Sequence, residues 1–230
     1  MGQYVCASRL LCPALRLTVA RRTVGYGVGS SLHHIGPEYG FSFAMDEALQ
    51  EDVLVIKWAF GGTTISGNWR PPSSTLNNKT AAAGVVGPLY LKMVNGTREI
   101  LKNLPHYFPE YADRQQFEFQ GFGWFLGWND GCGQASTDEY EFNMVSHCSR
   151  TCSQTCSRIY TRSCFQVNMI KDVRREFGNP KMAVSIPVSG FDGWMQTSPR
   201  RLGIIKAQFD AANATRHPEV SAATVGLGCD

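Results

Sequence analysis

Three short runs of apolar residues, each of strand length, constrain the fold of this chain more than any other feature. They are "VLVIKWAF" at 53–60, "FEFQGFGWFL" at 117–126 and "MAVSIPV" at 182–188. Nearly continuous apolar runs of this length are typical of strands that are covered on both faces, as in parallel sheets.

Stretches with helical periodicity alternate with these runs. One begins at Pro88, ends before Pro105 and carries its apolar residues on one side: Leu89, Met93, Ile100, Leu101 and Leu104. Another is opened by Pro37 and carries four apolar residues: Phe41, Ala44, Ala48 and Leu49. Strands that alternate with helices predict parallel β-α-β units in a layered α/β fold, with ligand chemistry at the carboxyl ends of the strands.

Length and charge narrow the class of protein. A chain of 230 residues predicts one domain. Its hydrophobic share of 43% is that of a globular protein, and its charged share of 18% is below the roughly 25% usual for soluble domains, so disorder over the whole length is not expected. The net charge of +3 comes from residues 1–37 and 146–167, which contain arginines and no acid, so a nucleic-acid partner has little support. The sequence contains no run of 18 apolar residues, so no membrane-spanning helix is predicted.

The first 22 residues are set apart as an atypical or unstructured N-terminal segment, and residues 23–230 as the domain. The segment is poor in acids and contains arginine, which leaves a targeting signal and a merely frayed start as alternatives.

Two glycine-rich turns follow predicted strands. In "AFGGTTISGNW", Gly61 and Gly62 would let the backbone approach a substrate and point a peptide N–H at it, although a tight strand exit is the favoured interpretation of Gly-Gly taken alone. In "WFLGWNDGC", Asn129 could offer its amide to a developing oxyanion, while Gly127 and Asp130 support the turn. Ordinary turn chemistry is again the alternative.

Four segments in order resemble a known family. "AFGGTTI" resembles the second conserved block of the SGNH hydrolases, and Gly127-Trp128-Asn129-Asp130 resembles the third. Within that superfamily, "IGPEYGFSFAMDEAL", "IKWAFGGTTISGNWRPPSS", "GFGWFLGWNDG" and "IKDVRREFGNPKMAVSIPVSG" are similar to successive segments of the sialate O-acetylesterase-type carbohydrate esterases.

This resemblance implies a three-layer α/β/α, flavodoxin-like parallel sheet. It also implies hydrolysis of O-acetyl esters on sugars, of the sialic acid or the plant and algal polysaccharide type, without metal or cofactor. In this chemistry a serine attacks the acetyl carbonyl, a histidine moves its proton, and N–H donors stabilise the oxyanion. Gly61 or Gly62 and Asn129 match the second-block and third-block donors. An exported protein is also implied, but no convincing signal peptide precedes the domain.

The nucleophile and the base are not identifiable in the sequence. "GVGSSLHH" contains Ser30 and Ser31 without a buried strand before them. The five histidines match no catalytic block and are interpreted as solvated loop residues: His33, His34, His106, His147 and His217. Leu126 stands where many relatives have glutamine. The chain therefore resembles an SGNH domain that is incomplete at both ends, and which sugar it binds and how it oligomerises are not encoded in any readable motif.

A cysteine-rich segment interrupts the domain at 146–167, with Cys148, Cys152, Cys156 and Cys164. Removing it brings five apolar residues to helical spacing: Phe142, Val145, Ile170, Val173 and Phe177. The favoured interpretation is an insertion into a helix. A surface disulfide loop and a metal site are the alternatives.

Three hypotheses follow. The first is an acetylesterase of the carbohydrate type, with an acetylated carbohydrate as its partner. The second is a catalytically inactive, carbohydrate-binding relative. The third is a metal- or disulfide-linked interaction protein defined by the cysteine-rich segment.

Overall fold

A computed structural model describes the residues 3–7, 14–16, 18–20, 34–49, 53–75, 84–112, 117–144, 168–215, 217 and 223–225. The chain divides into two compact units. Unit 1 consists of Met1–Gly62 and Asn95–Gln115, and unit 2 of Thr63–Val94 and Gln116–Asp230. None of the helices in the described ranges combines the length and the apolar character that crossing a bilayer requires.

Unit 1 contains an antiparallel sheet in the order β3-β2-β1-β4. Its strands are β1 (Gln3–Ala7), β2 (Ala14–Arg16), β3 (Thr18–Ala20) and β4 (Leu54–Lys57). The first three lie within residues 1–22. The apolar run at 53–60 does form a strand, but β4 pairs antiparallel with β1, with Val5 opposite Ile56. The alternation of strands and helices had predicted a parallel partner for this run.

The core of unit 1 forms where β4 meets the end of a long helix. That helix, α2 (Pro88–Lys102), confirms the helix predicted from Pro88, and its residues 95–102 belong to unit 1. It is followed by α3 (Leu104–Tyr107) and a short 3₁₀ turn, η2 (Pro109–Tyr111). Buried Ile100 and Phe108 pack with partly buried apolar residues from these elements: Leu54, Ile56, Trp58, Leu104, Tyr107 and Tyr111.

Helix α1 (Glu38–Leu49) forms where Pro37 predicted a helix, but it buries the opposite face. Its apolar residues are exposed: Phe41, Ala44, Ala48 and Leu49. Glu38 and Ser42 are buried instead, because the Glu38 carboxylate binds Lys57 Nζ of β4 at 2.8 Å. A polar contact to β4, rather than the apolar stripe, therefore sets the orientation of α1.

Unit 2 contains the parallel sheet that the sequence predicts, in the order β5-β6-β7. The strands are β5 (Gly121–Gly123), β6 (Ala183–Pro187) and β7 (Ala223–Val225), so the runs at 117–126 and 182–188 each supply one strand. Phe122 lies opposite Val184, and Ile186 lies opposite Thr224. The described part of the chain is therefore mixed α/β with a small parallel sheet.

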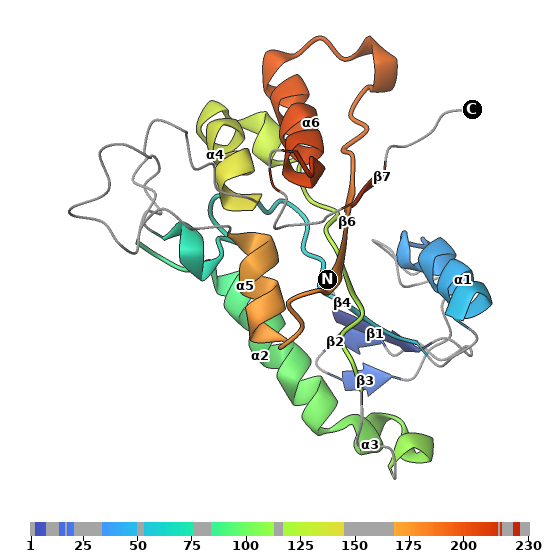
Figure 1. Cartoon of the computed structure of the whole chain (residues 1–230). Coiled ribbons are helices and arrows are strands. Elements are labelled where there is room, and N and C mark those ends of the chain that lie inside the picture. The colour runs from blue at the N-terminus through green and yellow to red at the C-terminus, as the bar shows by residue number, and fades with distance from the viewer. Residues whose placement is uncertain are drawn as a thin grey trace. The chain divides into compact units, whose positions relative to one another are not determined.

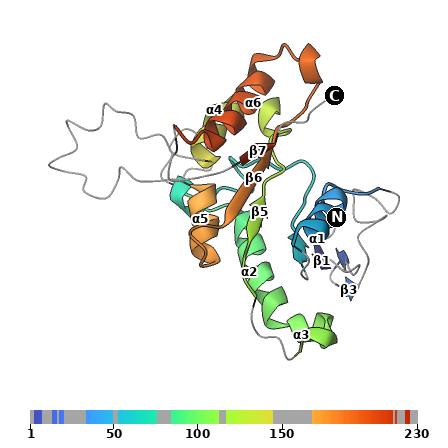
Figure 2. The ribbon, with the colours of Figure 1, turned by 45° about the vertical axis from the view of Figure 1, so that its right-hand side comes forward.

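Helices connect these parallel strands. Helices α4 (Gln134–Met144) and α5 (Met169–Glu176) lie between β5 and β6 in the chain, and α6 (Pro199–Ala212) lies between β6 and β7. Helices α4 and α6 pack side by side, as Figures 1 and 2 both show. Three 3₁₀ turns complete the described elements of unit 2: η1 (Pro72–Ser74), η3 (Asp130–Cys132) and η5 (Gly193–Met195).

Helices α4 and α5 flank the cysteine-rich segment, whose residues lie outside the described ranges. The Asn168 side-chain amide, just before α5, donates a hydrogen bond to the Phe142 carbonyl near the end of α4. The two helix ends that border the segment are thus in direct contact. Ile170 and Val173 of the predicted stripe are fully buried in α5.

Candidate active site

The turn that contains Asn129 begins where β5 has ended and leads into η3. Asn129 itself has helical dihedral angles, φ −72° and ψ −29°, and lies directly before η3. The Gly131 N–H donates to the Gly127 carbonyl at 3.0 Å, and the Cys132 N–H donates to the Asn129 carbonyl at 3.1 Å. These bonds close the turn, which therefore presents the Asn129 side chain from an ordered backbone.

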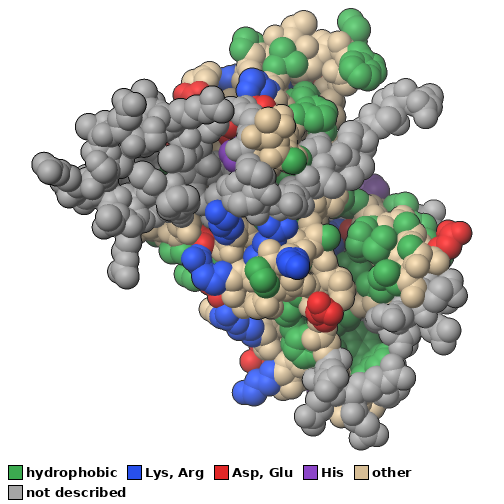
Figure 3. Space-filling view, viewed as in Figure 1, with side chains coloured by type: hydrophobic (Ala, Val, Ile, Leu, Met, Phe, Trp, Pro, Cys, Tyr) green, Lys and Arg blue, Asp and Glu red, His purple; other side chains and the backbone are tan. Residues whose placement is uncertain are grey.

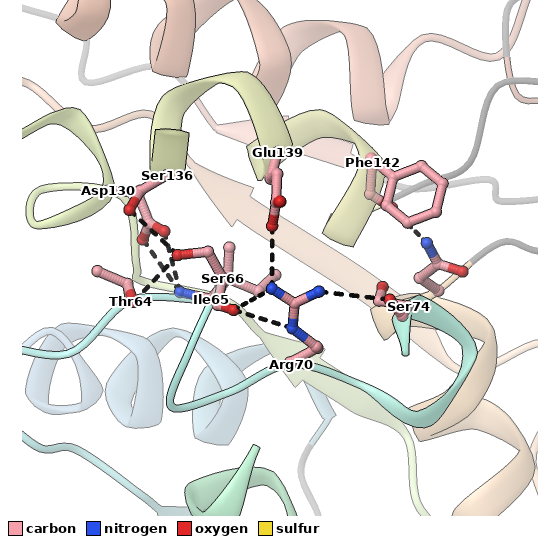
Figure 4. A network of polar contacts seen from close by, with 10 residues as sticks. Thr64, Ile65, Ser66, Arg70, Ser74, Asp130, Ser136, Glu139 and Phe142 are labelled. Atoms are coloured by element: carbon pink, nitrogen blue, oxygen red, sulfur yellow. Dashed lines mark hydrogen bonds and ion pairs between the residues drawn. The ribbon is translucent and has the colours of Figure 1, made fainter. Parts of the chain in front are cut away.

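Asp130 connects this turn to the other glycine-rich segment. Its carboxylate accepts the backbone N–H of Ile65, at 3.0 Å to Oδ1 and 3.2 Å to Oδ2. Figure 4 shows the fully buried carboxylate directed at that N–H. The bonds that Asp130 accepts thus fix the backbone at Ile65 against the third-block turn within unit 2.

Burial also changes the acidity of Asp130. Loss of hydration raises the pKa of this carboxyl from 3.8 to about 7, although the hydrogen bonds from the backbone of Ile65 and Ser66 act in the opposite direction. The side chain therefore titrates near neutrality. The same burial, with the charge of Asp130 as a smaller cause, raises the pKa of the Tyr140 hydroxyl.

Gln208 of α6 holds the chain segments that follow β5 and β6. Its amide Nε2 donates to the Leu126 carbonyl at 3.3 Å and to Ser189 Oγ at 3.1 Å, while its Oε1 accepts the Ser189 N–H at 2.8 Å. The Tyr140 hydroxyl also donates to the Leu126 carbonyl. A fully buried amide thus fixes the point at which the Asn129 turn begins.

Gly127 fits this point because it has no side chain. A Cβ added there would lie 2.9 Å from Cγ2 of Ile204 and 3.0 Å from Nε2 of Gln208. Both contacts are tighter than packed atoms tolerate, so close packing of the turn against α6 requires glycine.

A buried ion pair anchors the segment after Ile65. Arg70 and Glu139 are almost completely buried, and Arg70 Nη2 lies 3.0 Å from Glu139 Oε2. Arg70 Nε also donates to the Ser66 carbonyl at 2.9 Å (Figure 4). Further along, Asp172 of α5 accepts the N–H and the hydroxyl of Ser73 at 2.8 and 2.7 Å. Residues 65–74 are therefore held by side chains of η3, α4 and α5.

The Asn129 side chain is half-buried and does not take part in these networks. It makes no capping bond to η3 and no hydrogen bond with any residue in the described ranges. Its neighbour Asp130 is fully engaged, so the turn is stable without the Asn129 amide. Within the described part of the chain, nothing therefore occupies that amide.

Gly61 and Gly62 end the first of the two segments that form unit 1, and both are exposed. Gly62 has a φ of +73°, in the left-handed region that a residue with a side chain rarely adopts. Asn129, Gly127 and Asp130 lie in unit 2.

The histidines are distributed differently from the prediction. His34 and His106 are exposed, as predicted for solvated residues. His217 is buried, so the prediction was wrong there; its backbone N–H donates to the Asn213 carbonyl at 2.8 Å in the segment that follows α6. Ser30, Ser31, His33 and His147 lie outside the described residues.

Residues 34–49, 53–75, 84–112, 117–144 and 168–215 bring together no group of three or more metal-ligating side chains. Cys132 is a free, exposed thiol, and the cysteines of the segment at 146–167 lie outside the described part of the chain.

Sequence reasoning missed three residues that shape this site: Arg70, Glu139 and Gln208. Gln208 had a readable signal, since it is a polar residue within the buried face formed by Ile204, Ala207 and Ala211 of α6.

Comparison with known proteins does not identify the chain, because no protein-family model, no curated protein and no solved structure matches it.

Proposed function

We propose that this protein is a carbohydrate esterase of the SGNH type, with a three-layer, flavodoxin-like fold, that removes O-acetyl groups from sugars. The parallel order β5-β6-β7, with helices in both crossovers, supports the fold. The observation that carries the activity is the amide of Asn129, which bonds to no described residue, in a turn that Asp130 and Gln208 hold in place.

Ester hydrolysis requires donors at the position where negative charge develops. When a serine hydroxyl attacks the acetyl carbonyl, the carbonyl oxygen becomes an oxyanion as the hydroxyl proton passes to a histidine. The Asn129 amide is the proposed donor in unit 2, and the resemblance assigns a second donor to the backbone of Gly61 or Gly62. Serine and histidine are not assigned to residues of this chain.

A donor held before the substrate arrives is effective because it need not reorient during the reaction. Asp130 supports this arrangement from behind the turn, since its bond to Ile65 fixes the backbone next to Asn129. Asp130 is therefore proposed as a positioning residue.

The experiment is hydrolysis of p-nitrophenyl acetate by a chain extended with a Gly-Gln-Ser-Asn strand at its front and a histidine block at its end. We expect Asn129→Ala to reduce turnover on the order of 10²-fold, the usual effect of losing one oxyanion donor. Folding should change little, because no described residue uses the Asn129 side chain. The matched control is Asn95→Ala, an exposed asparagine of α2.

Two outcomes would contradict the proposal. If Asn129→Ala unfolds the protein while the remaining folded fraction keeps full turnover, Asn129 is a structural turn residue. If the extended chain binds acetylated sugar but never hydrolyses the ester, the inactive carbohydrate-binding relative is the better description.

A further inference from the structure

An exposed tryptophan and a half-buried phenylalanine lie next to Asn129. Trp128, its chain neighbour, is 52% exposed, and its ring centroid lies 5.1 Å from that of Phe191, with an angle of 31° between the rings. Arg201 of α6 places its guanidinium carbon 5.5 Å from the centroid of each ring. We name these three residues the aromatic platform.

The aromatic platform is built on the third-block turn itself. A Cβ added to Gly131 would lie 3.1 Å from the Phe191 ring and 3.4 Å from Cγ of Arg201, so both side chains rest on the backbone of that turn. The turn after β5 and the segment after β6 therefore meet here. Both segments follow the carboxyl ends of parallel strands, where ligand sites of α/β sheets form.

Phe191 adopts a backbone conformation that is unfavourable for its residue type. Its φ of +42° lies in the left-handed region, which bulky residues rarely adopt. The surrounding segment holds it there: Asp192 Oδ2 accepts Arg201 Nη1 at 2.6 Å and Gln196 Nε2 at 2.8 Å. Strain of this kind is concentrated at functional sites.

Core packing does not explain why Trp128 is exposed beside half-buried Phe191. In the same segment Trp194 is 90% and Met195 82% exposed. Figure 3 shows hydrophobic side chains over the segment between β6 and α6, at the top of the view. Exposed apolar surface rimmed by polar groups is typical of a binding site.

We propose that the aromatic platform binds the C–H face of a neutral, O-acetylated pyranose and so presents its acetyl group beside Asn129. This inference rests on the proposed function. A pyranose ring has an apolar face that aromatic rings desolvate, and hydroxyls at its rim that need polar partners. Asp192 and Gln196 supply such partners at the edge of the platform. Because Asp192 forms an ion pair with Arg201, this pair adds no net charge that would favour an anionic sugar.

The test is to titrate the unmodified chain with O-acetylated xylohexaose and to measure binding by calorimetry and by tryptophan fluorescence. We expect Trp128→Ala to weaken binding about tenfold and Trp128→Phe to retain most of the affinity, in proportion to the aromatic surface that remains. Phe191→Asn should also weaken binding about tenfold without loss of thermal stability, because asparagine tolerates a positive φ. Phe209→Ala, which removes an exposed aromatic ring from α6 outside the platform, is the matched control and should bind as the wild type does.

A second arm uses an O-acetylated sialic acid, which is anionic, and here we expect weaker binding than to the neutral sugar. Tighter binding of the anionic sugar would overturn the assignment to a neutral pyranose. Unchanged sugar affinity in both Trp128→Ala and Phe191→Asn would overturn the platform as a sugar site. Self-association in sedimentation that these variants abolish, without sugar binding by the wild type, would assign the surface to a protein contact instead. Sugar binding is measured without hydrolysis. A failure to bind sugar at the platform and a failure to hydrolyse the ester are therefore separate results.

Discussion

The Asp130 carboxylate accepts the backbone N–H of Ile65 at 3.0 Å, which joins two residues that are 65 positions apart in the sequence. Both partners are fully buried, and the bond holds the segment that begins at Thr63 against the Asn129 turn in unit 2. The backbone that carries the Asn129 amide is therefore fixed by its chain neighbour Asp130.

Asp130 predicts an unusual dependence of stability on pH. Its pKa is about 7 in the folded state and 3.8 without burial, so the folded protein binds the proton more tightly than the unfolded chain. Its contribution to stability is complete below pH 4 and is lost as the pH rises through about 7. Relative to Asp130→Asn, the wild type should lose up to about 4 kcal/mol of unfolding free energy across this window, since one pKa unit corresponds to about 1.4 kcal/mol. Urea unfolding at several pH values measures this difference.

The matched control for this prediction is Asp138→Asn. Asp138 is an exposed carboxylate on α4, and its substitution should leave the pH profile of stability as it is in the wild type. The prediction would be contradicted if the unfolding free energies of Asp130→Asn and the wild type changed in parallel from pH 4 to pH 8.

The buried pair of Arg70 and Glu139 predicts a large loss of stability when one partner is removed. Glu139→Ala leaves a buried guanidinium without its carboxylate and should cost about 3–5 kcal/mol of unfolding free energy. The double variant Arg70→Met with Glu139→Leu removes both charges and should recover most of that loss. Chemical denaturation of the three proteins measures it.

Lys206→Ala is the comparison variant for the buried pair. Lys206 forms an exposed ion pair with Asp210 on α6, and its loss should change the unfolding free energy by less than about 1 kcal/mol. If Glu139→Ala and Lys206→Ala lower the unfolding free energy equally, the buried pair contributes no more to stability than the exposed one.

Gly127 predicts opposite effects for two glycine substitutions. Gly127→Ala forces a Cβ against Ile204 and Gln208 and should destabilise the protein by about 1–3 kcal/mol. Gly40→Ala, on α1, meets no atom within 4 Å and should be neutral or stabilising by up to about 1 kcal/mol, because alanine favours a helix. Thermal unfolding of both variants checks the sign, and a stable Gly127→Ala would mean that α6 packs less closely than described.

Removal of residues 146–167 should preserve or raise the melting temperature. The contact between Asn168 and Phe142 shows that the flanking helix ends already meet, so a direct connection needs little rearrangement. A long connection adds ordering cost and brings four cysteines. A clear drop in melting temperature, or loss of bound metal with the deletion, would instead support one of the alternative interpretations of the segment.

The sequence predicts elements better than it predicts their partners. Periodicity and Pro88 located α2, and the apolar run at 182–188 located β6, because both signals are local. The partner of β4 and the buried face of α1 were wrong, since each is decided by a contact made far along the chain: pairing with β1 in one case and the bond from Lys57 to Glu38 in the other.

The candidate site shows the same division. Asn129 was predicted as a site residue from its position after a strand, and its role stays a prediction. Arg70 was not, because a charged residue before two prolines is normally solvated. The burial of Arg70 becomes clear only in the structure, where Glu139 of α4 supplies a carboxylate for the guanidinium.

The order of the chain also has a consequence for folding. Residues 65–73 bind Asp130, Glu139 and Asp172, which follow them by 65, 69 and 99 positions. Contacts of such high sequence separation slow folding, because the chain loses loop entropy before it gains the bonds. During synthesis this early segment does not have all three partners until the ribosome has passed α5. We therefore expect unit 2 to become protease-resistant in one late step, after Asp172 has left the exit tunnel.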